Sequence, residues 1–338
     1  ASGDGGLGAG ASRPTPSTAT VAPTRPPAVV SFNGTQPWAE QVRILVRRQV
    51  AILKSDRQNL IFAAASVIIP AILILLLMPA HSLDTSQSGP VIARELLGAI
   101  VVAAVAIGAA NAVREIVKER AIYLRERSIG LRRSAYLVAK LAVLSALTCL
   151  QVTALVIITT LRSGGPRHAN LLLIPHLELI VDVSLTAIAA VALGLLVSTL
   201  VSSSEKGMAV IPVIFVVMWL FSGAALDLQS KPVLREIAML SSSNWGMAAS
   251  ASTVDEHQLS HSCSYLDGRS LSDTSSDSGD STGSTPQSEA TEQARRDALP
   301  VCDARWRSSI PIWLLSIIAL LVLTAVSIYG ADRLLARS

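Results

Sequence analysis

Long uncharged apolar stretches alternate with short charged segments over residues 37–338. A helix that crosses a bilayer needs about 20 mostly apolar residues, and several stretches meet that requirement. We therefore predict an all-α membrane protein with six transmembrane helices. The predicted spans are residues 59–79, 94–113, 135–161, 177–201, 207–228 and 310–331.

A helix with one apolar and one basic face is predicted just before the first span, over residues 37–59. At about 100° per residue, Trp38, Val42 and Leu45 share one face, whereas Arg43 and Arg47 lie on another. This pattern is typical of a helix that lies along a membrane surface. A core helix of a soluble domain is the alternative, but no other soluble core is predicted to receive it.

Basic residues are concentrated on one side of the predicted spans, which sets their orientation. The two short loops on the other side hold only Arg162 and Arg167. Cytoplasmic loops are enriched in Lys and Arg, so we predict a multi-pass protein of the cytoplasmic (inner) membrane with both termini inside. A large outer loop, residues 229–309, follows the fifth span. The basic residues assigned to the inside are Arg43, Arg47, Arg48, Lys54, Arg57, Arg114, Lys118, Arg120, Arg125, Arg127, Arg132, Arg133, Lys206, Arg333 and Arg337.

Residues 1–36 are mainly Gly, Ala, Ser, Thr and Pro, with few large apolar groups. Such a segment cannot bury enough surface to offset the entropy lost on ordering, so we predict a disordered linker. Because the first residue is Ala rather than Met, we expect this linker to follow a further domain upstream.

The composition agrees with a bilayer environment, since only 15% of the residues are charged against roughly 25% in an average soluble domain. The formal charge is +4, and no basic stripe is interleaved with aromatic residues, so we predict no nucleic-acid partner. A lipid-acting membrane enzyme would need an acid/base pair, a nucleophile or a metal constellation, and none is found. We predict no catalytic site, metal site or cofactor on this chain.

The segment between the second and third spans carries charges of both signs at helical spacing: VREIVKERAIYLRERSIGLRRSAYLVAK, residues 113–140. We predict a cytoplasmic helix here, and a solvated inner loop with no further role is the alternative. The segment resembles the coupling helix of ABCG (White)-type ABC exporters, whose pattern is E-[RK]-x-x-[FY]-x-R-E-x-x-x-G followed by A-Y-x-x-x-K. The matching residues are Glu119, Arg120, Tyr123, Arg125, Glu126, Gly130, Ala135, Tyr136 and Lys140.

Further motifs extend this resemblance over residues 37–338: LGLLVSTLVSS at 193–203, and Phe-Ser-Gly at 221–223 followed by Asn-Trp-Gly at 244–246. The resemblance implies a permease domain of ABC-2/ABCG type that works as a homodimer. It also implies a nucleotide-binding domain upstream in the same polypeptide, which would hold ATP and Mg, because no G-x-x-x-x-G-K-[ST] motif occurs in this chain. Linker and permease are also similar to actinobacterial exporters with forkhead-associated domains upstream.

The resemblance assigns roles to two groups of residues. The coupling helix is expected to dock on the nucleotide-binding domain, with Glu119 and Arg125 exposed in the isolated chain. At the outer gate, family members commonly have two leucines where this chain has Ala224 and Ala225. Either Phe221 and Leu226 form the plug instead, or, as we favour, a looser gate admits a bulkier substrate. The full coupling set is Glu115, Glu119, Arg120, Tyr123, Arg125 and Glu126.

Three polar side chains within or at the ends of the predicted spans are considered as functional candidates. We assign Asn111 to the substrate path, although an interhelical hydrogen bond is the favoured interpretation. Glu178 and Asp182 lie near the outer end of the fourth span. Ionisable groups in spans often mark ion paths, but this position favours a solvated helix end.

Two cysteines, Cys263 and Cys302, lie in the predicted outer loop, where an oxidising environment lets a disulfide persist. Related exporters carry an intramolecular disulfide in this loop, so the resemblance implies one here. Two free thiols or an intermolecular bridge are the alternatives.

The sequence therefore predicts the permease domain of an ATP-driven exporter that moves a hydrophobic or amphipathic substrate outward. A lipid or glycolipid is favoured, because few aromatic residues are available to hold a flat molecule. The alternative is an ion-coupled secondary transporter or channel that uses Glu178 and Asp182.

Overall fold

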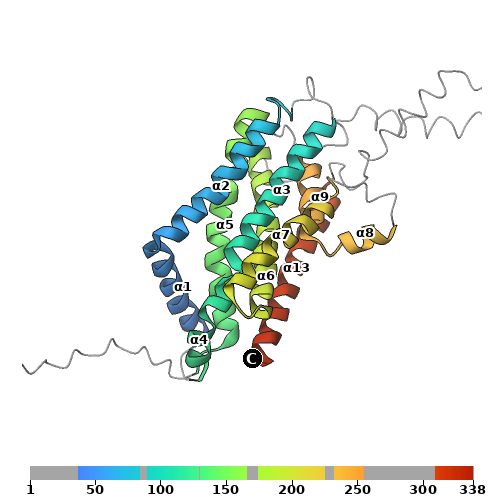
Figure 1. The fold of residues 1–338 in the computed structure, drawn as a ribbon. Coiled ribbons are helices and arrows are strands. Elements are labelled where there is room, and N and C mark those ends of the chain that lie inside the picture. The colour runs from blue at the N-terminus through green and yellow to red at the C-terminus, as the bar shows by residue number, and fades with distance from the viewer. Residues whose placement is uncertain are drawn as a thin grey trace, which may run out of the picture.

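The computed structural model describes residues 37–83, 90–128, 130–165, 174–224, 232–254 and 309–337, in which every regular element is an α-helix. This confirms the prediction of an all-α membrane protein. Most of the helices run alongside one another as an elongated bundle (Figure 1). The helices are α1 (Trp38–Ser55), α2 (Arg57–Leu77), α3 (Pro90–Ala112), α4 (Glu115–Ser128), α5 (Arg133–Ser163), α6 (Pro175–Leu200), α7 (Ser204–Leu220), α8 (Pro232–Ala238), α9 (Ser242–Val254) and α13 (Ile310–Arg337).

Five helical segments of the described chain are long and apolar enough to cross a membrane. They are α2, the stretch that contains α3, α5, α6 and α13, and each lies over a predicted span. The end of the bundle that holds α4 and the end of the chain is called the α4 end below, and the other the α9 end (Figure 1).

The fifth predicted span, 207–228, is wrong at its C-terminal side, because α7 ends at Leu220. Gly223 has a φ of 81°, a left-handed conformation that glycine adopts without steric cost. The Ser222 hydroxyl accepts from the Ala224 amide at 3.1 Å and so closes the turn. The Phe-Ser-Gly sequence thus ends a helix of 17 residues, fewer than the roughly 20 of a full span.

Helix α6 lies at the centre of the bundle, packed against α3, α5, α9 and α13. Small residues permit this close packing. A Cβ added at Gly108 of α3 would lie only 2.5 Å from the carbonyl oxygen of Ala187, and one added at Gly194 of α6 only 2.8 Å from the Cβ of Ala112. In lipid, such close contact replaces the hydrophobic drive that packs helices in water.

Part of the predicted outer loop, 229–309, is a buried helix. Nearly every residue of α9 is inaccessible to solvent, and the helix packs against α3, α6 and α13. Its sequence, SSNWGMAASASTV, is rich in small and hydroxyl-bearing residues, which is why its hydropathy resembles that of a loop. The prediction of a loop here therefore needs correction, because tertiary burial rather than apolar character keeps this segment in the bundle.

Helix α1 was predicted to lie along the membrane surface, but in the structure it packs against another helix. Its buried residues are Gln41, Leu45 and Gln49, one stripe at a spacing of four, and the helix packs along α5. The predicted helix over 37–59 also breaks at Asp56, which is the N-cap of α2. Its carboxylate accepts hydrogen bonds from the amides of Gln58 and Asn59. Aspartate is a favoured N-cap because it satisfies otherwise unpaired amides.

Candidate coupling site

Helix α4 begins directly after α3, at a position fixed by a residue of α6. The hydroxyl oxygen of Ser198 accepts hydrogen bonds from the amides of Ile116 and Val117, at 3.0 and 3.1 Å. The first amides of a helix have no acceptor within that helix. Here the acceptor comes from a spanning helix, so the start of α4 is attached to the centre of the bundle.

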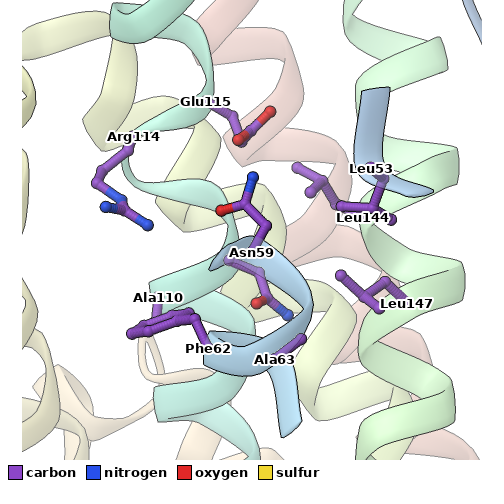
Figure 2. A pocket seen from close by; sticks show the side chains of 10 residues that line it. Leu53, Asn59, Phe62, Ala63, Ala110, Arg114, Glu115, Leu144 and Leu147 are labelled. Atoms are coloured by element: carbon purple, nitrogen blue, oxygen red, sulfur yellow. The ribbon is translucent and has the colours of Figure 1, made fainter. Parts of the chain in front are cut away.

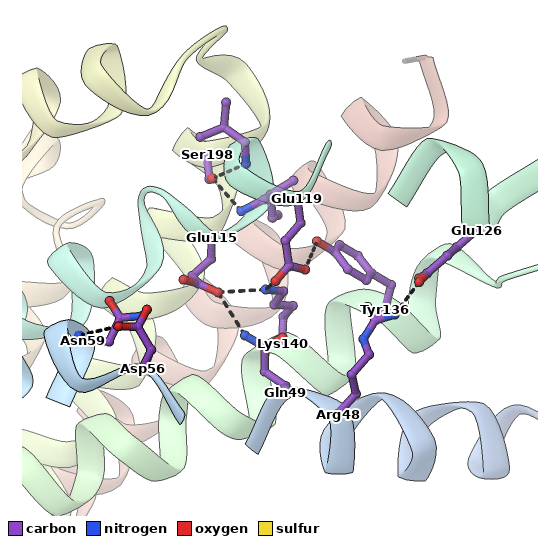
Figure 3. A network of polar contacts seen from close by, with 12 residues as sticks. Arg48, Gln49, Asp56, Asn59, Glu115, Glu119, Glu126, Tyr136, Lys140 and Ser198 are labelled. Carbon is purple, nitrogen blue, oxygen red and sulfur yellow. Dashed lines mark hydrogen bonds and ion pairs between the residues drawn. The ribbon is translucent and has the colours of Figure 1, made fainter. Parts of the chain in front are cut away.

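A buried lysine joins α4 to α5. The ammonium of Lys140 lies 2.7 Å from a carboxylate oxygen of Glu115 and 2.9 Å from one of Glu119, and its side chain is 3% exposed (Figure 3). Each carboxylate has a second contact: Gln49 of α1 donates to Glu115 at 3.1 Å, and the Tyr136 hydroxyl to Glu119 at 3.5 Å. Because the spacing of four places Glu115 and Glu119 on one face, both carboxylates reach the same ammonium.

The C-terminal half of α4 contacts the first and last helices of the described chain. Arg48 of α1 forms an ion pair with Glu126 (Figure 3), and the next residue, Arg127, donates to the main-chain carbonyl of Leu335 in α13 at 2.9 Å. The Tyr123 ring is buried against Tyr136, with ring centroids 4.8 Å apart. Helix α4 is thus bonded to α1, α5, α6 and α13.

The six predicted coupling residues divide between two faces of α4. Glu115, Glu119, Tyr123 and Glu126 point into the bundle, and the expected exposure of Glu119 is wrong, since its side chain is 12% exposed and paired with Lys140. Arg120 and Arg125 are exposed, as expected for Arg125. They belong to an outer face of mixed basic and apolar character, which we call the α4 outer face: Lys118, Arg120, Ile122, Leu124 and Arg125.

Lys140 is the residue whose role the sequence alone did not reveal. It was visible only as the last position of a motif, although Glu115 with Glu119 and Tyr136 with Lys140 are both pairs at a spacing of four on neighbouring helices. Gln41 and Gln49 were also missed. Glutamines on the buried stripe of an amphipathic helix are a readable signal, because buried amides need hydrogen-bond partners.

Asn111 makes the interhelical hydrogen bonds that the sequence favoured. Its amide nitrogen donates to Thr148 at 2.9 Å and to Gln151 at 2.6 Å, both in α5. Gln151 in turn donates to the Ala63 carbonyl at 3.0 Å and so connects α2 to this network. Asn111 also lines a cavity whose walls come from α1, α2, α3, α5 and the start of α4.

The predicted gate residue Ala224 lies far from Asn111 along α3. Ala224 packs against Gly98, where an added Cβ would lie 2.4 Å from the Ala224 Cβ. Gly98 and Asn111 are thirteen residues apart on α3, which is about 20 Å at 1.5 Å per residue. Asn111 and Ala224 therefore lie at different levels of the bundle, and the assignment of either to a substrate path or gate stays a prediction. Phe221 is the C-cap of α7, and Ala225 and Leu226 lie outside the described residues.

Glu178 and Asp182 are both fully buried, so the interpretation as a solvated helix end is wrong. The Thr253 hydroxyl of α9 lies 2.9 Å from Glu178 and 2.8 Å from Asp182, and the indole of Trp313 in α13 donates to Asp182 at 2.8 Å. Helices α9 and α13 exclude water from this end of α6, which hydropathy alone does not reveal. The predicted disulfide partners Cys263 and Cys302 lie outside the described residues.

Comparison with known proteins identifies the family to which this chain belongs. The chain is similar to an ABC transporter ATP-binding/permease protein of Mycobacterium tuberculosis, with 32% identity over 225 residues, which is 64% of this chain and 25% of that relative. The chain thus spans about a quarter of the relative's length. Residues 40–254, well over half of the chain, match the family described as ABC-2 type transporter. The chain therefore belongs to the ABC-2 type transporter family.

Proposed function

We propose that this chain is the membrane part of an ATP-driven exporter, in which α4 transmits the movement of a nucleotide-binding domain to the spans. The observation that carries the proposal is the position of α4. Its inner face is bonded to α1, α5, α6 and α13, while its outer face presents basic and apolar side chains to a partner. The similar mycobacterial protein is named as ATP-binding as well as permease.

In this proposal the α4 end faces the cytoplasm, because the predicted inner segments are the basic ones. The chain acts as a homodimer of ABCG type, and ATP and Mg are held by the nucleotide-binding domain. The substrate is a lipid or glycolipid that crosses between the two copies. In its support, α2 and α7 expose large apolar side chains that either lipid or a second copy can cover.

The α4 outer face supplies the test. We expect the double variant Ile122→Ala, Arg125→Glu to retain ATP hydrolysis but to lose at least about tenfold in ATP-driven lipid flux, because its changes fall on the docking surface. Exposed substitutions usually change stability by less than about 0.5 kcal/mol, so thermal unfolding should not shift. The measurement uses the native protein with its nucleotide-binding domain, in proteoliposomes.

Arg47→Glu is the matched control, since Arg47 is also exposed but lies on α1. It should leave both hydrolysis and flux unchanged. Normal flux in the α4 variant, or equal loss in the control, would overturn the assignment of α4.

A second candidate, ion-coupled transport, is favoured by one observation: the complete burial of Glu178 and Asp182 inside a spanning helix. Buried ionisable groups in membranes are costly and often functional. Flux in the same proteoliposomes under a proton gradient and without ATP would support this candidate over the exporter. Flux that needs ATP and ignores the gradient would exclude it.

A further inference from the structure

A part-open cavity lies at the α4 end, where α1 meets α2. The space between its walls is about 370 Å³, a figure that includes open solvent at the mouth, so only its inner part is enclosed. Its walls come from α1, α2, α3, α5 and the start of α4 (Figure 2). Apolar side chains dominate the lining, with Asn59, Asn111, Arg114 and Glu115 as its polar members. Mostly apolar walls with a few placed polar groups are typical of sites for amphipathic ligands.

The charge that this cavity offers to a ligand is positive. Glu115 is already paired with Lys140 at 2.7 Å. The guanidinium of Arg114 instead lies over the Phe62 ring, 5.6 Å from its centroid, and has no carboxylate within ion-pair distance among the described residues. This cation–π contact favours the present position of the guanidinium, and its planar set of donors matches the oxygens of a phosphate.

The two asparagines favour a headgroup that carries hydroxyl groups. The amide nitrogen of Asn111 donates to Thr148 and Gln151, and that of Asn59 donates to Asp56 at 2.7 Å. Both amide hydrogens of Asn111 are used by these bonds, so what it offers the cavity is its carbonyl oxygen, which is an acceptor. Asn59 offers its carbonyl oxygen and the second hydrogen of its amide nitrogen. Hydroxyl groups can donate to these oxygens, whereas a quaternary ammonium such as choline has no hydrogen to donate.

An apolar track continues from the cavity along α2. Phe62, Ile69, Leu73 and Leu76 recur at the spacing of one helix face, and they are 38%, 66%, 53% and 79% exposed. Since α2 is long and apolar enough to cross a membrane, this face is able to contact acyl chains. A lipid whose headgroup contacts Arg114 could therefore extend one acyl chain along this face of α2.

We propose that this cavity binds an anionic glycerophospholipid with a hydroxylated headgroup, of the phosphatidylglycerol class, from the leaflet beside the α4 end. Arg114 contacts the phosphate, the carbonyl oxygens of Asn59 and Asn111 accept from the glycerol hydroxyls, and one acyl chain follows α2. The proposal does not rest on the exporter assignment, since lipid binding is measured without ATP or transport. It makes the junction of α1, α2 and α4 sensitive to the composition of that leaflet.

The experiment is native mass spectrometry of the detergent-solubilised protein, titrated with phosphatidylglycerol and, in parallel, with phosphatidylcholine of the same acyl chains. Wild type should prefer phosphatidylglycerol. Arg114→Gln should weaken its binding by about tenfold and abolish the preference, because one charge-assisted contact is lost. Ala63→Leu keeps the charge but fills the cavity from α2, and it should weaken binding comparably.

Arg120→Gln is the control for charge alone, because Arg120 is exposed on α4 and does not line the cavity. It should retain wild-type affinity and preference. Unchanged binding in both Arg114→Gln and Ala63→Leu, or an equal loss in Arg120→Gln, would overturn the proposal. So would complete displacement of the lipid by millimolar glycerol phosphate, which would show a soluble phosphate site instead. Thermal unfolding of each variant verifies that the fold is retained.

Discussion

The two ends of the bundle are held together by different kinds of contact. At the α4 end, helices meet through charged side chains: Lys140 bridges α5 to two glutamates of α4, and Arg48 reaches Glu126. At the α9 end they meet mainly through small residues and hydroxyl groups, one of which, on Thr253, also contacts the carboxylates of Glu178 and Asp182. Ser243 donates to the Met218 carbonyl at 2.6 Å, and Gly246 packs directly on Thr186.

The difference matters for movement. Charges attract over several ångströms, and long side chains can follow a partner that shifts, so α4 can move slightly without losing its bonds. Van der Waals attraction falls off steeply once a gap opens. The close-packed α9 end therefore has few arrangements open to it. A movement that enters at α4 is expected to pivot the spans about this rigid end rather than to stretch the whole bundle.

The largest effect is expected from removal of the central charge at the α4 end. Lys140→Met leaves Glu115 and Glu119 largely buried without this cation, and breaking a buried ion pair in this way costs about 3–5 kcal/mol. The free energy of unfolding in detergent measures it. Lys118→Met, on the exposed face of α4, should change stability by less than about 0.5 kcal/mol.

Adding Glu119→Gln to Lys140→Met should recover part of the loss, because one unpaired carboxylate is then removed. A Lys140→Met protein as stable as wild type would mean that charge does not hold this end together.

A smaller effect is expected at the α9 end from a single added methyl group. A Cβ at position 246 would lie 2.9 Å from the Thr186 Cβ and 2.3 Å from its hydroxyl oxygen. Gly246→Ala should therefore cost about 1–3 kcal/mol as an overpacked core substitution. Thermal unfolding in detergent is the measurement.

Gly330→Ala in α13 makes the same chemical change where the nearest atom is the tip of Leu196, 3.2 Å away. It should be neutral or slightly stabilising, because alanine favours the helix. If Gly246→Ala is equally harmless, the α9 end is less tightly packed than its geometry indicates.

The smallest effect is expected where α2, α3 and α5 share neutral hydrogen bonds. Asn111→Ala removes two interhelical bonds, which in membrane proteins contribute about 0.6 kcal/mol each on average, so the total loss should be about 1 kcal/mol. Ser145→Ala is the control in α5: its buried hydroxyl has no hydrogen-bond partner among the described residues. Equal unfolding free energies for the two variants would show that the Asn111 bonds add nothing to stability.

The sequence predicted most of the fold because a helix that faces lipid must be apolar whatever packs beside it, so its position can be read from local hydropathy. The spanning helices and the charged helix between the second and third spans could be located from local composition alone. Helix α9 could not, since Ser, Ala and Gly resemble a loop until α3, α6 and α13 surround them. The burial of Asp182 likewise depends on Thr253 and Trp313, which are 71 and 131 residues away in the chain.

The location of the site could be predicted from the sequence, but which of its side chains point into the bundle could not. Motif similarity located α4, whereas the division of its residues between an inner and an outer face depends on where α1 and α5 lie. Glu119 and Arg120 are adjacent in sequence, yet one is paired with Lys140 and the other is exposed. That difference follows from helix geometry once a single inward residue is known, and Tyr123 would have served as that residue.

The bond from Arg127 to the Leu335 carbonyl has an evolutionary consequence. Every amino acid offers the same main-chain carbonyl, so the residue at 335 can change without loss of this acceptor, whereas the donor must remain a long basic side chain. Correlated substitutions between the two positions are therefore not expected. Methods that infer contacts from covariation would miss a connection between the middle of this chain and its last helix.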